Sequence, residues 1–172
     1  SIALAERFRG EIVNCDSVQL YKYLNIGTAK VPPDQRRGIA HHLIDLLDPD
    51  QVFTAGDYAR SARQIVADIA GRGRLPVMVG GTGFYLRAFL HGLSETPVRD
   101  ESLRQRLAAR SPERLHRLLR RLDRRAAERI HPNDTNKVIR AIEVCVQARQ
   151  PITKVFEANP IRPLEGFRVH KV

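Results

Sequence analysis

Aromatic residues are scarce in this sequence, and tryptophan is absent. Phe and Tyr make up 6% of the 172 residues, whereas hydrophobic residues of all kinds reach 42%. A core can therefore form, but Ala, Leu, Ile and Val have to fill it. The length is that of one ordinary domain, or of one domain that carries a small insertion.

Cysteine is almost missing too, because the chain contains only Cys15 and Cys145. Their spacing does not suggest a metal site, and no signal peptide is recognisable. No apolar run approaches the roughly 20 residues that span a bilayer. We therefore expect two free thiols in a cytoplasmic protein that has no membrane partner. We also expect the protein to be a monomer.

Acidic residues are in short supply relative to basic ones. The chain has 29 Lys or Arg against 19 Asp or Glu, a net charge of +10. Residues 99–140 alone hold 13 basic and 6 acidic side chains, so most of the excess lies in a quarter of the chain. Such a local surplus favours a polyanionic partner.

Strand-like and helix-like segments alternate in the first hundred residues. Strands are predicted at residues 11–15, 42–47 and 75–79. Helices are predicted at residues 2–9, 54–70 and 84–90. The apolar run LPVMV at 75–79 is typical of a strand that is buried on both faces, and Thr54 with Asp57 fits a capping box in which Asp replaces Glu. The alternation predicts an α/β fold with a mainly parallel sheet and flanking helices.

The pattern changes near residue 100, where the strands stop and arginine becomes frequent. Helices are predicted at residues 101–110, 112–122, 124–130 and 134–149. Residues 167–172 alternate and suggest another strand of the core. We therefore divide the chain into an α/β core (1–98), a helical insertion (99–150) and a return to the core (151–172).

Two segments at predicted strand ends are candidates for chemistry. Asp16 and Ser17 follow the first strand, and Gly80–Gly83 (GGTG) follow the strand at 75–79. Ligands of open parallel sheets bind beyond the carboxyl ends of the strands, so these segments should face one crevice. Asp16 could accept a proton or orient a metal ion, or simply cap the next turn. The glycine segment could hold an anion on its amides, or serve only as a tight turn.

The remaining polar candidates lie mostly in the helical part. Spacing places Arg114, Arg117, Arg121 and Arg125 on one stripe, which favours RNA backbone contact over a merely solvated face. Asn133 or Asp134 is a natural helix N-cap.

Arg140 lies on the helix that follows this cap and could clamp a phosphate bidentately. The pair His41 and His42 fits the core or a strand edge better than a metal site, since no third ligand is near in sequence.

Taken together, these segments resemble the tRNA dimethylallyltransferase (tRNA isopentenyltransferase) family. The matching segments are GEIVNCDSVQLYKYLNIGTAK (10–30), HHLIDLLDPD (41–50), FTAGDYARSA (53–62), GRLPVMVGGTGFYLRAFLHGL (73–93) and RIHPNDTNKVIRAIEV (129–144). Several long motifs in the same order are far more specific than any one alone. The resemblance runs from about residue 2 to residue 155.

The resemblance implies an enzyme with a P-loop-like three-layer core. Such enzymes use Mg²⁺ and transfer a dimethylallyl group from its diphosphate to N6 of the adenosine 3′-adjacent to the anticodon, which is flipped out of the anticodon stem-loop. It implies Asp16 as the general base and places Thr82 near the reaction centre. The implied tRNA-binding residues are Asp16, Ser17, Val18, Gln19, Arg104, Asn136, Lys137, Val138, Ile139 and Arg140. Gly81, Thr82 and Arg140 are the implied diphosphate contacts.

Two departures from the family pattern are visible. Family members often have Gln-Arg where this chain has Asn136 and Lys137, and lysine keeps the charge but not the planar fork. The family also begins with a strand and a Gly-rich phosphate loop, which would precede residue 1, and ends with a further segment. We therefore expect an incomplete core in this chain, and no prenyl transfer by residues 1–172 alone.

Three other functions stay open at this point. A cytokinin-type enzyme would prenylate free adenine nucleotides, although the basic helices favour tRNA. A small-molecule kinase of the phosphate-loop type would share the sheet pattern but leaves the arginine-rich helices unexplained. A non-catalytic RNA-binding module is the third alternative.

Overall fold

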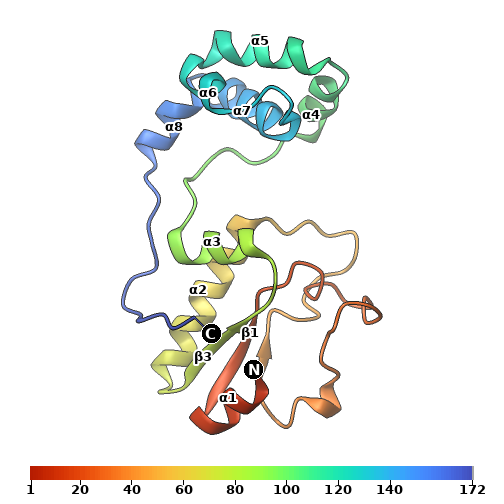
Figure 1. Ribbon diagram of the computed structural model, residues 1–172, viewed down its shortest axis with the longest axis vertical. Helices are drawn as coiled ribbons and strands as arrows, with labels where there is room; N and C mark the ends of the chain where they lie inside the picture. Colours follow the sequence, from red (N-terminus) through yellow and green to blue (C-terminus); the bar gives the residue numbers. More distant parts are fainter. Residues whose placement is uncertain (172) are drawn as a thin grey trace. The chain divides into compact units, whose positions relative to one another are not determined.

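The computed structural model describes residues 1–171, which form two compact units (Figure 1). The α/β unit combines Ser1–Gly92 with the chain from Pro163 onward, and the helical unit is Leu93–Arg162. Each unit has a hydrophobic core of its own. The boundaries lie at residues 92/93 and 162/163, whereas the sequence pattern placed them at 98/99 and 150/151.

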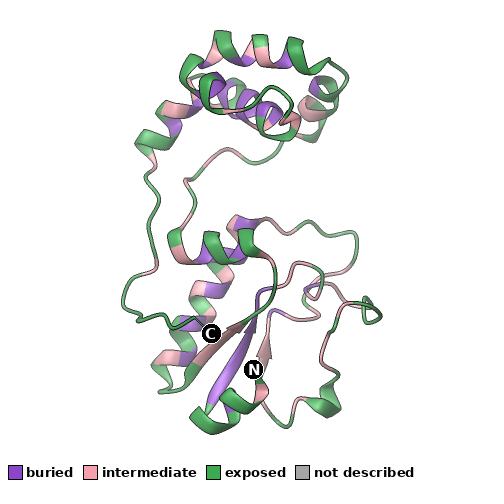
Figure 2. Cartoon of the chain, viewed as in Figure 1, coloured by how far each residue is buried: buried purple, intermediate pink, exposed green. Residues whose placement is uncertain are grey.

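The α/β unit is built on a parallel sheet with the strand order β2–β1–β3. Its elements are α1 (Ile2–Phe8), β1 (Gly10–Asn14), the 3-10 helix η1 (Pro33–Gln35), β2 (His41–His42), α2 (Ala55–Gly71), β3 (Leu75–Val79) and α3 (Gly83–His91). The central strand β1 is buried along its whole length (Figure 2). Helices α1 and α2 pack against β1 and β3, and α3 packs against α2. The predicted α/β fold with a parallel sheet and flanking helices is confirmed.

Two of the strand predictions were wrong. The strand expected at residues 42–47 ends at His42, because Leu43 and Asp45 adopt left-handed backbone conformations with φ of 56° and 53°. Such angles do not fit an extended strand. No strand forms over residues 167–171, and Val172, the last residue of that prediction, lies outside the described residues.

The strand β3 has the predicted bounds but not the predicted burial. Leu75 and Val79 at its two ends are 44% and 37% exposed. Within the described residues β3 pairs only with β1, so it is an edge strand. An edge strand has fewer neighbours to cover its side chains than a central one.

Helix α2 begins with the predicted capping box. The Thr54 hydroxyl accepts from the Asp57 amide at 3.2 Å, and the Asp57 carboxylate accepts from the Thr54 amide at 3.0 Å. One turn further, the ring of Tyr58 stacks on that of Tyr85 from α3 with centroids 4.4 Å apart. The cap and the stack fix where α2 and α3 start relative to the sheet.

The helical unit consists of α4 (Glu101–Ala108), α5 (Pro112–Leu122), α6 (Arg124–Arg129), α7 (Thr135–Ala148) and α8 (Ile152–Ala158). Helix α7 contacts α4, α5 and α8 and carries most of the core. Leu115, Leu119, Val138, Ile142 and Val144 are fully buried there. None of the helices in the described residues combines the length and apolar character that a bilayer span requires.

The helix α8 was missed by the sequence reasoning. The helix is only 7 residues long, so the apolar residues Ile152, Val155 and Phe156 cover about two turns and do not establish a helical period. Because α8 packs on α7, residues 152–158 belong to the helical unit and not to the returning core. The return begins later, where the Leu164 amide donates to the Leu90 carbonyl at 2.8 Å.

Candidate functional site

The candidate site of the α/β unit lies at the carboxyl ends of β1 and β3. These two strands run parallel with Asn14 opposite Val79. The pairing continues one residue further, since the Cys15 amide donates to the Val79 carbonyl at 2.7 Å. The segments that follow the two strands therefore start side by side.

Thr82 joins the two segments. Its amide donates to the Cys15 carbonyl at 3.0 Å, and its Oγ1 accepts from the Ser17 amide at 2.9 Å. The Thr82 Oγ1 also lies 3.2 Å from Ser17 Oγ, within hydrogen-bonding distance. The Asp16–Ser17 and glycine segments are therefore adjacent, as the predicted common crevice requires.

Gly80 is required by this close approach. A Cβ atom at position 80 would lie 2.3 Å from the Cys15 carbonyl carbon and 2.8 Å from the Asp16 amide nitrogen. A Cβ at Gly81 would meet nothing within 4 Å. The first glycine therefore has a steric role, while the second leaves its backbone open to solvent.

Asp16 serves as a cap and keeps one oxygen available. Its Oδ1 accepts from the amides of Val18 and Gln19 at 2.8 and 3.3 Å. Oδ2 makes no hydrogen bond within the described residues, and the side chain is half-buried. The capping interpretation and the catalytic one are thus compatible, because they use different oxygens.

Asn14 is a site residue that the sequence reasoning missed. Its buried side-chain amide donates to the carbonyls of Leu43 and Asp16 at 2.7 and 3.1 Å, and accepts from the Asp16 amide at 3.1 Å. The hydroxyl of the buried Tyr58 donates to the Asn14 carbonyl at 2.9 Å. Asn14 thereby fixes the backbone that carries Asp16. A polar residue inside an apolar strand was the available signal.

Cys15 lies in the same turn but has the properties of a core residue. Its thiol is buried and points toward the Thr82 carbonyl at 3.9 Å. Burial raises the pKa of this thiol, so it stays protonated and unreactive at neutral pH.

The other residues implied on this segment sit at its outer side. Val18 is exposed, and the Gln19 side chain donates to the Thr28 carbonyl at 2.9 Å, where it braces the following loop.

Beyond the loop, His42 and Glu11 are hydrogen-bonded at 2.7 Å, and His41 contacts the Ile39 carbonyl at 2.9 Å. The strand-edge interpretation of the two histidines is confirmed. No group of three or more His, Cys, Asp or Glu side chains gathers in the part of the chain described by the structure.

Helix α7 carries the second set of implied residues. Asp134 is its N-cap, with its carboxylate bound to the Lys137 amide and, at 2.6 Å, to the Lys137 ammonium group. Asn136 and Lys137 are exposed. Val138 and Ile139 are instead buried in the helical core, so their side chains do not suit the tRNA contact that the resemblance implied. The amphipathic period of α7 turns these two positions inward.

Arg104 and Arg140 converge on one buried carboxylate. Arg140 donates to Glu143 at 2.6 Å, and Arg104 from α4 donates to the same carboxylate at 3.3 Å. Glu143 is fully buried and was not predicted as a site residue. In the helical unit, therefore, the two implied arginines form a single arrangement.

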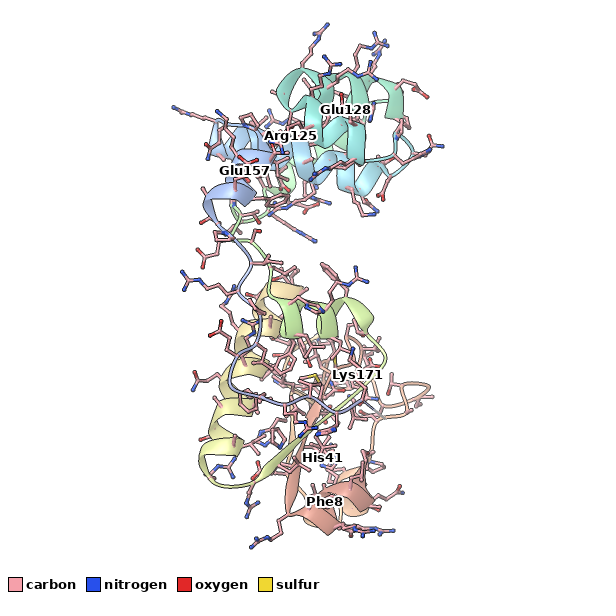
Figure 3. All side chains as sticks on the ribbon, turned by 60° about the vertical axis from the view of Figure 1, so that its left-hand side comes forward. Phe8, His41, Arg125, Glu128, Glu157 and Lys171 are labelled. Carbon is pink, nitrogen blue, oxygen red and sulfur yellow. The ribbon has the colours of Figure 1, made fainter. Side chains whose placement is uncertain are left out.

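The predicted arginine stripe is shorter than expected. Arg114, Arg117 and Arg121 are exposed on α5, and the helix buries Leu115 and Leu119 on its other side. Asp123 ends α5 and caps α6, so Arg125 starts a different helix. There Arg125 pairs with Glu157 of α8 at 2.8 Å, and Figure 3 shows the two side chains reaching toward each other.

Comparison with known proteins shows to which protein family the chain belongs. The family model described as IPP transferase matches residues 19–172. The chain belongs to the IPP transferase family.

The relatives and solved structures that this chain resembles have names that fit this family. The chain is 55% identical to a tRNA dimethylallyltransferase of Solibacter usitatus and 56% identical to one of Koribacter versatilis, over 100% of this chain and 57% of each relative. A solved structure is described as a eukaryotic dimethylallyltransferase acting on tRNA. The match covers 94% of this chain and 41% of the solved chain, with a TM-score of 0.78 and 29% sequence identity. A tRNA isopentenylpyrophosphate transferase from Bacillus halodurans matches 87% of this chain and 51% of its own, with a TM-score of 0.54 and 39% identity. The chain spans about half the length of the curated relatives it matches.

Proposed function

We propose that this chain is the part of a tRNA dimethylallyltransferase that supplies the general base and an RNA-binding surface. The reaction moves a dimethylallyl group from dimethylallyl diphosphate to N6 of the adenosine 3′-adjacent to the anticodon. The observation that carries the proposal is the join between Asp16–Ser17 and Thr82 at the strand ends, in a chain of the IPP transferase family.

The chemistry is a substitution at the first carbon of the dimethylallyl group. The N6 nitrogen forms a bond to that carbon as the bond to the diphosphate oxygen breaks, and the bonding electrons leave with the diphosphate. The N6 proton passes to Asp16 Oδ2, the oxygen that the turn leaves uncommitted. Because Asn14 holds the backbone of Asp16 from inside the sheet, the base is positioned before the substrate arrives.

Thr82 and Ser17 act on the leaving group. The Thr82 hydroxyl is already occupied by the Ser17 amide and lies against the Ser17 hydroxyl. We assign to the Ser17 hydroxyl and the open backbone of Gly81 the hydrogen bonds to diphosphate oxygens, with Thr82 orienting Ser17. Donors fixed in advance stabilise the charge that develops as the diphosphate departs.

Magnesium is compatible with the donor set at these strand ends. Mg²⁺ usually binds through one or two carboxylates together with water and substrate phosphates. The Ser17 hydroxyl is the side chain that would hold it, together with water and the substrate, because Asp16 Oδ1 already accepts two amides and Oδ2 is the proposed base. When bound, the ion would neutralise charge on the diphosphate.

The helical unit is proposed to bind the tRNA backbone. Residues 99–140 have seven more basic than acidic side chains, and Arg114, Arg117 and Arg121 are exposed on one helix. Phosphate contacts from such a surface give affinity and orientation without reading sequence. Substrate choice would then depend on the flipped base and the shape of the stem-loop.

The test uses the full-length gene product with labelled dimethylallyl diphosphate and Mg²⁺. Unmodified tRNA and free adenosine monophosphate are offered in separate reactions, and label incorporation is measured. We expect incorporation into tRNA at the adenosine after the anticodon and none into the free nucleotide. Label only in the free nucleotide would support a cytokinin-type enzyme instead. No incorporation despite RNA binding would support a non-catalytic module.

A further inference from the structure

Glu143 on α7 is the most completely buried acidic side chain of the helical unit, with 0% exposure. Its carboxylate accepts three hydrogen bonds, two from the α4 segment and one from α7 itself. Oε1 accepts from the Asp100 amide at 2.6 Å, and Oε2 accepts from Arg140 and Arg104 at 2.6 and 3.3 Å. One carboxylate thus ties the start of α4, the interior of α4 and α7 together.

Arg140 extends this arrangement to the segment that enters the unit. Its Nη2 donates to the Thr96 hydroxyl at 2.9 Å and to the Pro97 carbonyl at 2.8 Å. Glu143 fixes the other end of the same guanidinium. The rotamer of Arg140 is therefore determined from both sides.

The charge of this cluster does not cancel. Two guanidinium groups share one carboxylate, which leaves a local charge of about +1, since arginine stays protonated. The side chains of Arg104 and Arg140 remain 19% and 28% exposed. A guanidinium has five N–H donors in a fixed plane, so each arginine keeps donors that its hydrogen bonds within the described residues do not use.

We propose that Glu143 is a positioning residue for RNA binding, which holds Arg104 and Arg140 in the geometry that receives a backbone phosphate. The proposal rests on the proposed RNA-binding function of the helical unit. Simple electrostatics gives the opposite expectation, because a negative charge close to RNA should weaken binding. Replacing Glu143 with a neutral residue therefore distinguishes the two expectations. RNA binding weakens if Glu143 positions the arginines, and it tightens if only the negative charge matters.

The experiment measures the binding of an anticodon stem-loop RNA to residues 1–172 over a range of salt concentrations. Glu143→Gln keeps the shape of the side chain but removes the charge that holds both arginines. We expect roughly tenfold weaker binding, the effect of losing hydrogen bonds between charged groups. The slope of log affinity against log salt should fall by about one.

The matched control is Glu157→Gln. This exposed carboxylate also pairs with an arginine of the helical unit, Arg125, at 2.8 Å. We expect unchanged or slightly tighter RNA binding in this variant, since a surface charge of the same sign as RNA is removed. Equal effects of Glu143→Gln and Glu157→Gln would overturn the proposal.

A double-mutant cycle separates positioning from general destabilisation. In an Arg104→Gln background, Glu143→Gln should weaken RNA binding less than in the original chain, because one of the positioned groups is already gone. The same loss in both backgrounds would overturn the proposal. If circular dichroism shows Glu143→Gln to be unfolded, Glu143→Asp replaces it, since it keeps the charge but withdraws the carboxylate from the arginines. An original chain without salt-dependent RNA binding would overturn the RNA-binding function and the inference together.

Discussion

Thr82 Oγ1 accepts a hydrogen bond from the Ser17 amide at 2.9 Å, and so joins the segments that follow β1 and β3. Replacing Thr82 with Ala breaks this join and leaves the Ser17 hydroxyl without its neighbour. We expect turnover of the full-length enzyme to fall about 10²-fold, because the Ser17 donor loses the orientation that Thr82 gives it. Binding of tRNA should change little.

The measurement is a comparison of single-turnover rate and tRNA affinity in Thr82→Ala and Thr82→Ser. The serine variant keeps the hydroxyl and should retain most of the activity. Parallel losses of rate and affinity would mean that Thr82 only positions tRNA.

Gly80 and Gly81 should differ sharply in their tolerance of a side chain. Gly80→Ala would place a Cβ 2.3 Å from the Cys15 backbone, so the two segments have to separate. We expect a loss of about 3 kcal/mol in unfolding free energy, at the upper end of overpacking effects. Gly81→Ala, with open space around it, should be nearly neutral. Urea unfolding of both variants checks the contrast, and equal stabilities would contradict it.

The location of the site could be predicted from the sequence because it follows from connectivity. A polar residue after one buried strand and glycines after another have to meet if the strands are parallel neighbours. The apolar run at 75–79 and the pattern at 11–15 were sufficient for this step. The capping box at Thr54 was predictable because its two residues, Thr54 and Asp57, lie only three positions apart in the sequence.

The interactions that hold the site in place could not be predicted from sequence spacing. Asn14 reaches Leu43 across 29 positions, and Arg104 reaches Glu143 across 39. Such pairs depend on how the helices and the sheet pack. Val138 and Ile139 show the limit of transfer by motif, because a motif match marks a segment while the helical period decides which of its side chains face inward.

The exposed arginines of α5 should contribute to RNA binding through charge alone. We expect Arg117→Gln combined with Arg121→Gln to weaken the binding of different RNAs by similar factors. The slope of log affinity against log salt should fall by about one for each phosphate that the variant no longer neutralises. The control replaces both residues with lysine, which keeps the charge and should keep the slope. An unchanged slope in the glutamine variant would mean that this face is only solvated.

Glu11 should make folding stability depend on acid pH. It is buried in β1 and accepts hydrogen bonds from Arg72, Arg74 and His42. Hydrogen bonding to Arg72, more than offsetting the opposing effect of burial, lowers the pKa of Glu11 from 4.5 to about 2. A pKa that is lower in the folded protein means that protons bind the unfolded chain more tightly. The stabilisation is therefore full above pH 4.5 and is lost as the pH falls toward 2.

Urea unfolding between pH 7 and pH 3 measures this contribution. The original chain should lose stability as the pH falls, and Glu11→Gln should start lower and lose less. Glu6→Gln is the matched control, because Glu6 pairs with Arg37 on the exposed surface at 3.4 Å. The control should keep the pH dependence of the original chain. If Glu11→Gln kept the same pH dependence of stability as the original chain, that dependence would come from other carboxylates.

Asp16→Asn is the sharpest test of the chemistry, because asparagine preserves the cap and removes only the proposed base. The side-chain oxygen of asparagine can still accept from the Val18 and Gln19 amides, which lie 2.8 and 3.3 Å from Oδ1. We therefore expect unchanged stability and tRNA affinity in the full-length enzyme. Turnover should fall about 10²–10⁴-fold, the usual cost of losing a general base. Asp16→Ala removes the cap as well, and should add a loss of about 1 kcal/mol in unfolding free energy. Near-normal turnover in Asp16→Asn would exclude Asp16 as the base, because an asparagine side chain cannot take up the N6 proton.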